Sequence, residues 1–186
     1  MPPIRCFIAI EFDQAVRSRL LEARRALVAQ AGDAVRWARP EGLHVTLKFL
    51  GNVAPDRLPT IYQALRDTAR QAMPFTLSFS GLSAFPSLRR PRTLWLGLGG
   101  DIPRLLTLQA SVKRAIAPLG FPTEEQPFAA HITLGRVTGH LAGPIALAAD
   151  VFTAASQRVD FMSLMKSELR PGGSVYTRLS AFPLAP

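Results

Sequence analysis

The sequence predicts an α+β fold in which two pseudo-symmetric lobes of mainly antiparallel sheet, with outer helices, surround a central cleft. Two observations lead to this prediction. Strand and helix signals mix without a strict strand–helix–strand rhythm, and one short motif occurs twice, about half a chain apart. With 186 residues, of which 48% are hydrophobic and 19% charged, the chain has a globular composition. We therefore expect one two-lobed domain over residues 1–186, with one motif copy in each lobe.

The first half of the chain alternates between strand and helix signals. A buried strand is predicted over 5–12, because its central residues 6–10 are apolar and partly β-branched. An aspartate then serves as candidate N-cap of a helix over 13–30, where apolar residues recur at helical spacing. Short strands are expected at 35–38 and 43–50, on either side of a turn that contains proline. A second helix with one apolar face is expected at 55–72.

The second half carries the same kinds of signal. A segment in which apolar and hydroxyl residues alternate opens it, and a loop rich in proline and arginine follows. A Gly-Gly-Asp break precedes the third helix, and two alternating segments around a Pro-Gly-Gly turn predict a closing hairpin. The predicted elements are strands at 75–79, 93–98 and 130–137, a helix at 102–119, and a hairpin of 159–169 and 175–182.

The charge balance indicates anionic partners. The chain has 22 lysines and arginines against 13 acidic residues, a net charge of +9 and a pI near 11.1, which favours nucleic acid or nucleotides over a membrane surface. The single cysteine, Cys6, excludes an intrachain disulfide framework and a thiolate zinc site. No apolar stretch reaches the length of a signal-peptide core or a membrane helix. We therefore expect a cytoplasmic protein that does not enter a membrane.

A duplicated histidine motif is the most informative feature. The sequence His-Val-Thr-Leu begins at His44, and His-Ile-Thr-Leu begins at His131, 87 residues later. Both copies lie in predicted strands, where residues i and i+2 point to the same side. His44 therefore shares a face with Thr46, and His131 shares one with Thr133. If the two lobes face each other, two imidazoles and two hydroxyls converge on one cleft.

Such a set of side chains suits general acid–base catalysis on a phosphodiester. Imidazole titrates at about pH 6.5, so one ring can be neutral while the other is protonated. The neutral ring can take a proton from an incoming water while the protonated ring donates one to the departing ribose oxygen. Threonine hydroxyls can donate to phosphate oxygens, so no metal is needed. The residues by themselves do not show which histidine is the acid.

Other interpretations of the histidines are weaker. A lone histidine in a strand is usually structural, but the repeated pattern accounts for two of the chain's three histidines. The third, His140, lies outside the motif and is expected on the surface. Neither copy has an acidic or thiol neighbour at metal-ligand spacing, which disfavours a zinc site. The main alternative to an enzyme is a non-catalytic module that binds a nucleotide or RNA in the same cleft.

These motifs resemble those of the two-histidine phosphoesterase superfamily and, within it, the RNA 2′,3′-cyclic phosphodiesterase family, also called 2′-5′ RNA ligases. The resemblance extends over nearly the whole chain, through segments 5–10, 44–51, 85–86, 90–97, 131–136, 167–169 and 173–176. It implies a bilobal fold, without metal or nucleotide cofactor, that hydrolyses the terminal 2′,3′-cyclic phosphate of RNA to a 2′-phosphate. Reverse 2′-5′ RNA ligation, and cyclic mononucleotides as substrates, remain alternatives.

The resemblance also implies roles for individual residues. His44 would be the proton donor to the leaving 3′-oxygen, and His131 would be the proton acceptor that activates water. Thr46 and Thr133 would hold the phosphate. Arg136 would also reach the phosphate if the strand bends just before it.

Two further residues are candidates by position. Lys48 lies two residues beyond Thr46, so strand alternation places it on the His44 face, where it could attract phosphate. Phe49 could stack on a nucleobase or belong to the core. The densest basic cluster, at 89–92, lies in an expected loop and could contact an RNA backbone. We expect a monomer that acts on RNA ends or nucleotides carrying a cyclic phosphate.

Overall fold

The structure is a computed structural model, and it describes residues 2–121, 126–145, 155–171 and 173–185. Within these residues, three α-helices accompany nine strands of one antiparallel sheet, which confirms the predicted α+β class. The helices are α1 (Gln14–Ala31), α2 (Leu58–Ala69) and α3 (Ile102–Ile116). The strands are β1 (Ile4–Glu11), β2 (Val35–Trp37), β3 (His44–Val53), β4 (Phe75–Phe85), β5 (Thr93–Gly100), β6 (His131–Val137), β7 (Ser156–Val159), β8 (Phe161–Arg170) and β9 (Gly173–Pro183).

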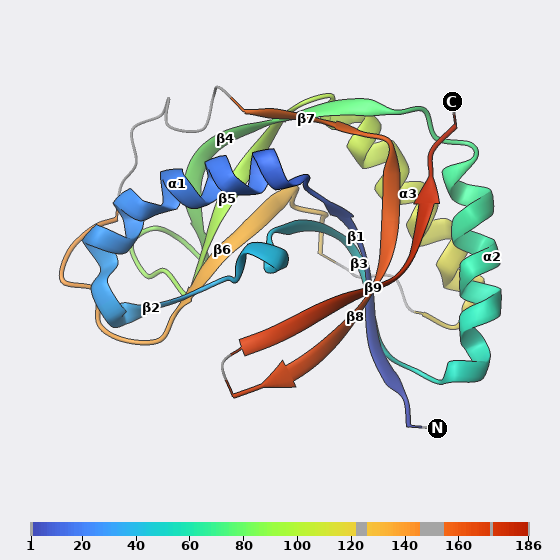
Figure 1. Ribbon diagram of the computed structural model, residues 1–186, viewed down its shortest axis with the longest axis horizontal. Helices are drawn as coiled ribbons and strands as arrows, with labels where there is room; N and C mark the ends of the chain where they lie inside the picture. The colour runs from blue at the N-terminus through green and yellow to red at the C-terminus, as the bar shows by residue number, and fades with distance from the viewer. Residues whose placement is uncertain (1, 122–125, 146–154, 172, 186) are drawn as a thin grey trace.

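The two strands that carry the histidine motif meet at the centre of the sheet. The strand order is β7-β4-β5-β6-β3-β1-β8-β9, and β2 pairs with β6 beside this path. A single residue pair, Val45 and Ile132, joins β3 to β6, so a narrow junction separates β7, β4, β5, β6 and β2 from β3, β1, β8 and β9. Figure 1 shows the sheet curling strongly, with the β8–β9 hairpin turned away from β4, β5 and β6.

The helices bury the apolar faces that the sequence pattern predicts. α1 begins after Asp13, whose side chain accepts a hydrogen bond from the Val16 amide at 2.7 Å, as an N-cap does. Gly32 caps its other end with a φ of 53°, a conformation that glycine adopts most easily. α2 and α3 pack against each other at the end of the molecule opposite to α1 (Figure 1). Among the described residues, no helix has both the length and the apolar character to span a membrane.

Several element boundaries differ from the sequence-based prediction. β3 continues to Val53 and β4 to Phe85, because register irregularities keep the glycine-containing stretches within the sheet. The strand expected at 159–169 is β8, which begins at Phe161 and pairs with β1 and β9, whereas Val159 ends the separate strand β7 beside β4. The first turn of the second predicted helix and the last turn of the third are 3₁₀ turns.

Candidate active site

Both copies of the histidine motif open into one cleft with a volume of about 400 Å³. His44, Thr46, His131 and Thr133 all line this cleft, so the structure brings together side chains that lie 87 residues apart in the sequence. The other motif residues point into the core and are at most 2% exposed: Val45, Leu47, Ile132 and Leu134. The strand alternation in the motif therefore separates a cleft face from a core face, as predicted.

A bulge in β3 changes which residues reach the cleft beyond the motif. In the β1–β3 register Thr46 lies opposite Ala9 and Lys48 lies opposite Ile8, which leaves Leu47 as an extra residue. An extra residue reverses the alternation of the strand that follows it. Two neighbouring residues, Leu47 and Lys48, are consequently both buried.

The bulge corrects one prediction and decides another. Lys48 is only 2% exposed and does not line the cleft, so the prediction that it shares the His44 face is wrong, because strict alternation ends at the bulge. Phe49 lines the cleft in its place and is 62% exposed. Its ring centroid lies 6.1 Å from that of Phe7. Phe49 is therefore a wall of the cleft and not a core residue.

β6 has the same kind of bulge at the matching place. The residue after Thr133 is extra in the β5–β6 register, as the residue after the first threonine is in the β1–β3 register. The alternation reverses here too, and Arg136 lines the cleft. Arg136 follows His131 by five residues, just as Phe49 follows His44 by five. The two halves of the site thus share one backbone pattern but carry different side chains at its end.

His131 is oriented by a backbone carbonyl and two aromatic rings. Its Nδ1 lies 2.7 Å from the carbonyl oxygen of Ala129. Because a carbonyl can only accept a hydrogen bond, Nδ1 carries a proton, and in the neutral ring Nε2 is the basic nitrogen. The rings of Phe85 and Trp95 meet the imidazole edge-on, with centroids 5.1 and 5.8 Å away. His131 is therefore held in the tautomer that a proton acceptor at Nε2 requires.

His44 lies in a drier environment. The rings of Phe7 and Tyr176 pack against it with centroids 4.8 and 5.2 Å away, and its Nδ1 is buried without a hydrogen bond of normal geometry. Burial lowers the pKa of His44 to about 4; the carboxylate of Glu11 opposes this shift in part, and a charge on His131 adds to it. Without an anion beside it, His44 is therefore neutral at pH 7.

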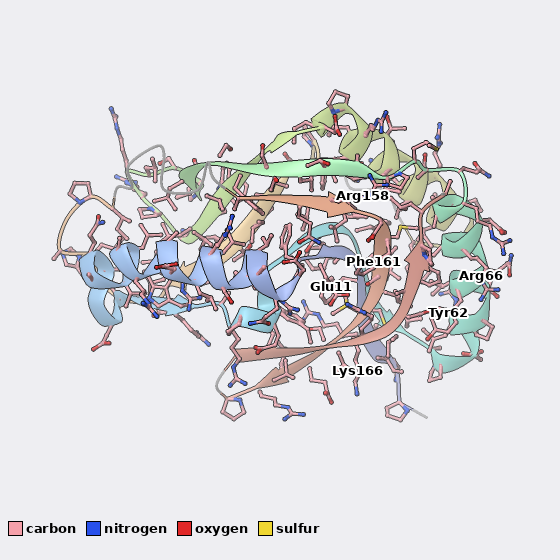
Figure 2. All side chains as sticks on the ribbon, turned by 45° about the horizontal axis from the view of Figure 1, so that its top comes forward. Glu11, Tyr62, Arg66, Arg158, Phe161 and Lys166 are labelled. Carbon is pink, nitrogen blue, oxygen red and sulfur yellow. The ribbon has the colours of Figure 1, made fainter. Side chains whose placement is uncertain are left out.

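A carboxylate lies on the strand next to His44, at the position directly opposite it. Glu11 is the register partner of His44 in the β1–β3 pair, and Nε of Arg178 on β9 donates to its Oε2 at 2.6 Å. Partial burial would raise the pKa of Glu11, but the hydrogen bond and charge of Arg178, with the charge of Arg17, outweigh burial and lower it. Arg178 also lies over the ring of Phe161, 5.1 Å from its centroid, and Figure 2 shows Glu11 and Phe161 in the same region. Glu11 is thus an ionised neighbour of His44.

Positive charge lines the cleft. Five arginines line it, from β1, β2, β6, β8 and the turn after β2: Arg5, Arg36, Arg39, Arg136 and Arg170. No described Asp or Glu lines the cleft with them. Sequence reasoning found only Arg136, because the others carry no motif; the available signal was an arginine between apolar residues in a predicted strand, as at Arg36. The basic cluster at 89–92 does not line the cleft.

The donor groups of the cleft are imidazoles, hydroxyls and guanidiniums. Within the described part of the chain, no three His, Cys, Asp or Glu side chains gather closely enough to hold a metal ion. Paired histidine–threonine motifs over an arginine-lined cleft are suited to proton transfer at a bound phosphate ester. The site therefore has the features of a phosphoesterase.

Comparison with known proteins identifies the family. The model of the LigT-like phosphoesterases matches residues 10–95 and 100–176. The chain is 36% identical over 190 residues to the RNA 2′,3′-cyclic phosphodiesterase of Methanothermobacter thermautotrophicus, covering 97% of this chain and 99% of that protein. It is 33% identical over 184 residues to the protein of the same name from Archaeoglobus fulgidus, covering 96% and 99%. The chain belongs to the LigT-like phosphoesterase family.

Solved structures share the fold over the whole length. A crystal structure of a Thermus thermophilus protein has a TM-score of 0.85 at 28% sequence identity and covers 97% of both chains. Escherichia coli LigT, crystallised with 3′-AMP, has a TM-score of 0.80 at 26% identity and covers 99% of both chains. The same protein has also been crystallised with phosphate and with ATP. The antiparallel α+β architecture is therefore that of the LigT structures.

Proposed function

We propose that this protein hydrolyses the 2′,3′-cyclic phosphate at the end of an RNA strand to a 2′-phosphate, by proton transfer between two histidines. The observation that carries the proposal is the opening of both histidine–threonine motifs into one arginine-lined cleft. The name of the curated relatives, RNA 2′,3′-cyclic phosphodiesterase, supports the substrate class. We further propose that the chain is a single domain of two lobes and acts as a monomer, because each half supplies one motif to the same cleft. We also propose a cytoplasmic location, in keeping with an RNA substrate and a free cysteine.

His131 is the proton acceptor in this mechanism. The Ala129 carbonyl holds its Nδ1 proton, so Nε2 of the neutral ring takes a proton from water as the water oxygen attacks phosphorus. The phosphorus–O3′ bond breaks, and His44 donates a proton to the departing O3′. One proton enters His131 and one leaves His44, and exchange with solvent restores both rings. Thr46 and Thr133 donate to the phosphate oxygens, and Arg136 balances their negative charge.

The proton donor must be charged, although burial lowers the pKa of His44 to about 4 in the free protein. A phosphodiester beside the ring favours the imidazolium, since an opposite charge within about 4–6 Å raises the pKa of a histidine. Glu11, held ionised by Arg178, acts in the same direction. Substrate binding therefore charges His44, and the reaction is coupled to the presence of the anion.

The asymmetry between the two halves supports the assignment of acid and base. Phe49 follows His44 on β3 and offers an exposed ring for a nucleobase to stack on. Arg136 follows His131 on β6 and offers charge to the phosphate. A substrate whose base stacks on Phe49 and whose phosphate meets Arg136 places its nucleoside on the His44 side of the cleft. The leaving ribose oxygen then faces His44, and the attacking water faces His131.

The product of the reaction tests the proposal. An oligoribonucleotide with a 2′,3′-cyclic phosphate is incubated with the protein in the presence of EDTA, and the product is analysed by ³¹P NMR. We expect a 2′-phosphate and no 3′-phosphate, because O3′ is the leaving group. His44→Ala and His131→Ala should each lower turnover by about a thousandfold or more, whereas His140→Ala, which alters the histidine outside the cleft, should not. A 3′-phosphate product, or full activity of either motif variant, would overturn the proposal.

A further inference from the structure

Two cleft arginines lie directly opposite each other in the sheet. Arg36 on β2 and Arg136 on β6 are register partners of an antiparallel pair, which places their Cα atoms about 5 Å apart and their side chains on the same face. Both side chains are exposed and both line the cleft. Arg39, in the turn that follows β2, lines it as well. Three arginines from β2, β6 and the segment after β2 therefore line the same cleft.

This arrangement is unfavourable without an anion. Like charges directly opposite each other in a sheet destabilise it, and neither Arg36 nor Arg136 has an ion-pair partner among the described residues. No described Asp or Glu lines the cleft to offset the charge. The repulsion is relieved when anionic oxygens lie between the guanidiniums, which bind phosphate through paired hydrogen bonds.

One phosphate does not account for all three arginines. In the proposed mechanism Arg136 already faces the terminal phosphate, from the strand that carries His131. Arg36 lies further along the cleft than the motif histidines, because β2 pairs only with residues 135–137, at the end of β6 away from His131. A second phosphate, connected to the first through one nucleotide, has the charge and the position to meet Arg36 and Arg39.

We propose that Arg36 and Arg39 form a second phosphate subsite, which binds the internucleotide phosphodiester on the 5′ side of the terminal cyclic phosphate. This inference rests on the proposed function and makes it more specific. The protein then selects RNA ends over cyclic mononucleotides, because only an oligonucleotide supplies the second anion. Arg136, between the two subsites, contacts the terminal phosphate and is partly shielded from Arg36 by the bound backbone.

Two dinucleotides of equal size test the subsite. Both end in a 2′,3′-cyclic phosphate, but one has a normal phosphodiester between its nucleosides and the other a neutral methylphosphonate. For the unmodified protein we expect kcat/KM to be about tenfold or more higher with the charged linkage, as for loss of a charge-assisted hydrogen bond. In Arg36→Gln the ratio of kcat/KM for the charged linkage to kcat/KM for the neutral linkage should fall below about threefold. Arg66→Gln is the matched control, since Arg66 is exposed on α2 and does not line the cleft (Figure 2).

Salt dependence supplies a second readout. For the charged dinucleotide, the plot of log kcat/KM against log salt concentration should be less steep in Arg36→Gln by about one unit of slope, the change expected for one lost phosphate contact. Arg66→Gln should keep the original slope. A linkage ratio near one in the unmodified protein would overturn the inference, as would a ratio that Arg36→Gln leaves unchanged.

The subsite can be judged even if the proposed activity fails. If the unmodified protein hydrolyses neither dinucleotide, the proposed function is wrong, and the affinities of the two dinucleotides are measured directly by calorimetry. Tighter binding of the charged linkage, lost in Arg36→Gln and kept in Arg66→Gln, supports a phosphate subsite. Equal affinities for the two linkages overturn it.

Discussion

Phe49 and Arg136 occupy equivalent places in the two halves of the site, each five residues after a cleft-facing histidine and each returned to the cleft by a bulge. The histidines and threonines before them are repeated without change, so it is at this position that the side chains lining the cleft differ between the two halves. An aromatic ring on one side and a guanidinium on the other give the cleft a direction. We infer that this direction sets which end of the nucleotide faces which histidine.

Replacement of Phe49 by alanine should weaken substrate binding without affecting the fold. Stacking of a base on an aromatic ring contributes about 1–3 kcal/mol, so we expect KM to rise about tenfold with little change in kcat. Because Phe49 is 62% exposed, the urea midpoint should not change. Leu88→Ala is the control, since Leu88 is exposed but lies outside the cleft. An unchanged KM in Phe49→Ala would contradict the stacking role.

Glu11 should support the protonated form of His44. In Glu11→Gln the carboxylate opposite His44 is lost, so the pKa of His44 in the substrate complex should fall. The basic limb of the kcat–pH profile should then move to lower pH, by about half a pH unit or more for a partly buried charge pair. Arg178→Gln removes the same ion pair but keeps the carboxylate, and should not lower the basic limb. Equal downward shifts in both variants would show that Glu11 acts only through the fold.

Burial of neutral His44 should make the protein less stable in acid. Its pKa is about 4 in the folded protein against about 6.5 when unfolded, so between these values the unfolded chain binds the extra proton. The resulting stability is full above about pH 6.5 and is lost as the pH falls towards 4. Between pH 7.5 and 4.5 the loss from this group is about 2.5 kcal/mol.

Urea denaturation at these two pH values isolates the contribution of His44. The loss of unfolding free energy on acidification should be smaller in His44→Gln than in the unmodified protein by that amount. His140→Gln, which alters an exposed histidine, should behave like the unmodified protein. Equal losses in all three proteins would show that His44 is not buried in the neutral form.

The motif and the fold class could be predicted because their signals are local. Alternation within a strand is enough to place His44 with Thr46 and to bury the residues between them, and helical spacing is enough to predict α1 with its cap at Asp13. The repeat itself indicates that two distant segments serve one site. The convergence of both motifs on one cleft follows from these signals, and the structure has it.

The bulges could not be predicted in the same way, because they depend on pairing with another strand. Nothing in the local sequence marks Leu47 as an extra residue, and strict alternation then places Lys48 in the cleft in place of Phe49. The charged wall was missed for a related reason. Arg36 and Arg136 lie 100 residues apart and become neighbours only through the β2–β6 register. Side-chain direction near a bulge and charge clusters between strands are properties of tertiary pairing.

The turnover of the double variant His44→Ala/His131→Ala, compared with both single variants, tests the central claim most directly. If one ring accepts a proton and the other donates one at the same phosphorus, neither is effective alone, and removing the second costs little more than removing the first. We predict that turnover falls by about a thousandfold or more in each single variant, and that turnover of the double variant lies within about tenfold of that of the less active single variant. Losses that multiply, or near-normal turnover in either single variant, would contradict the account.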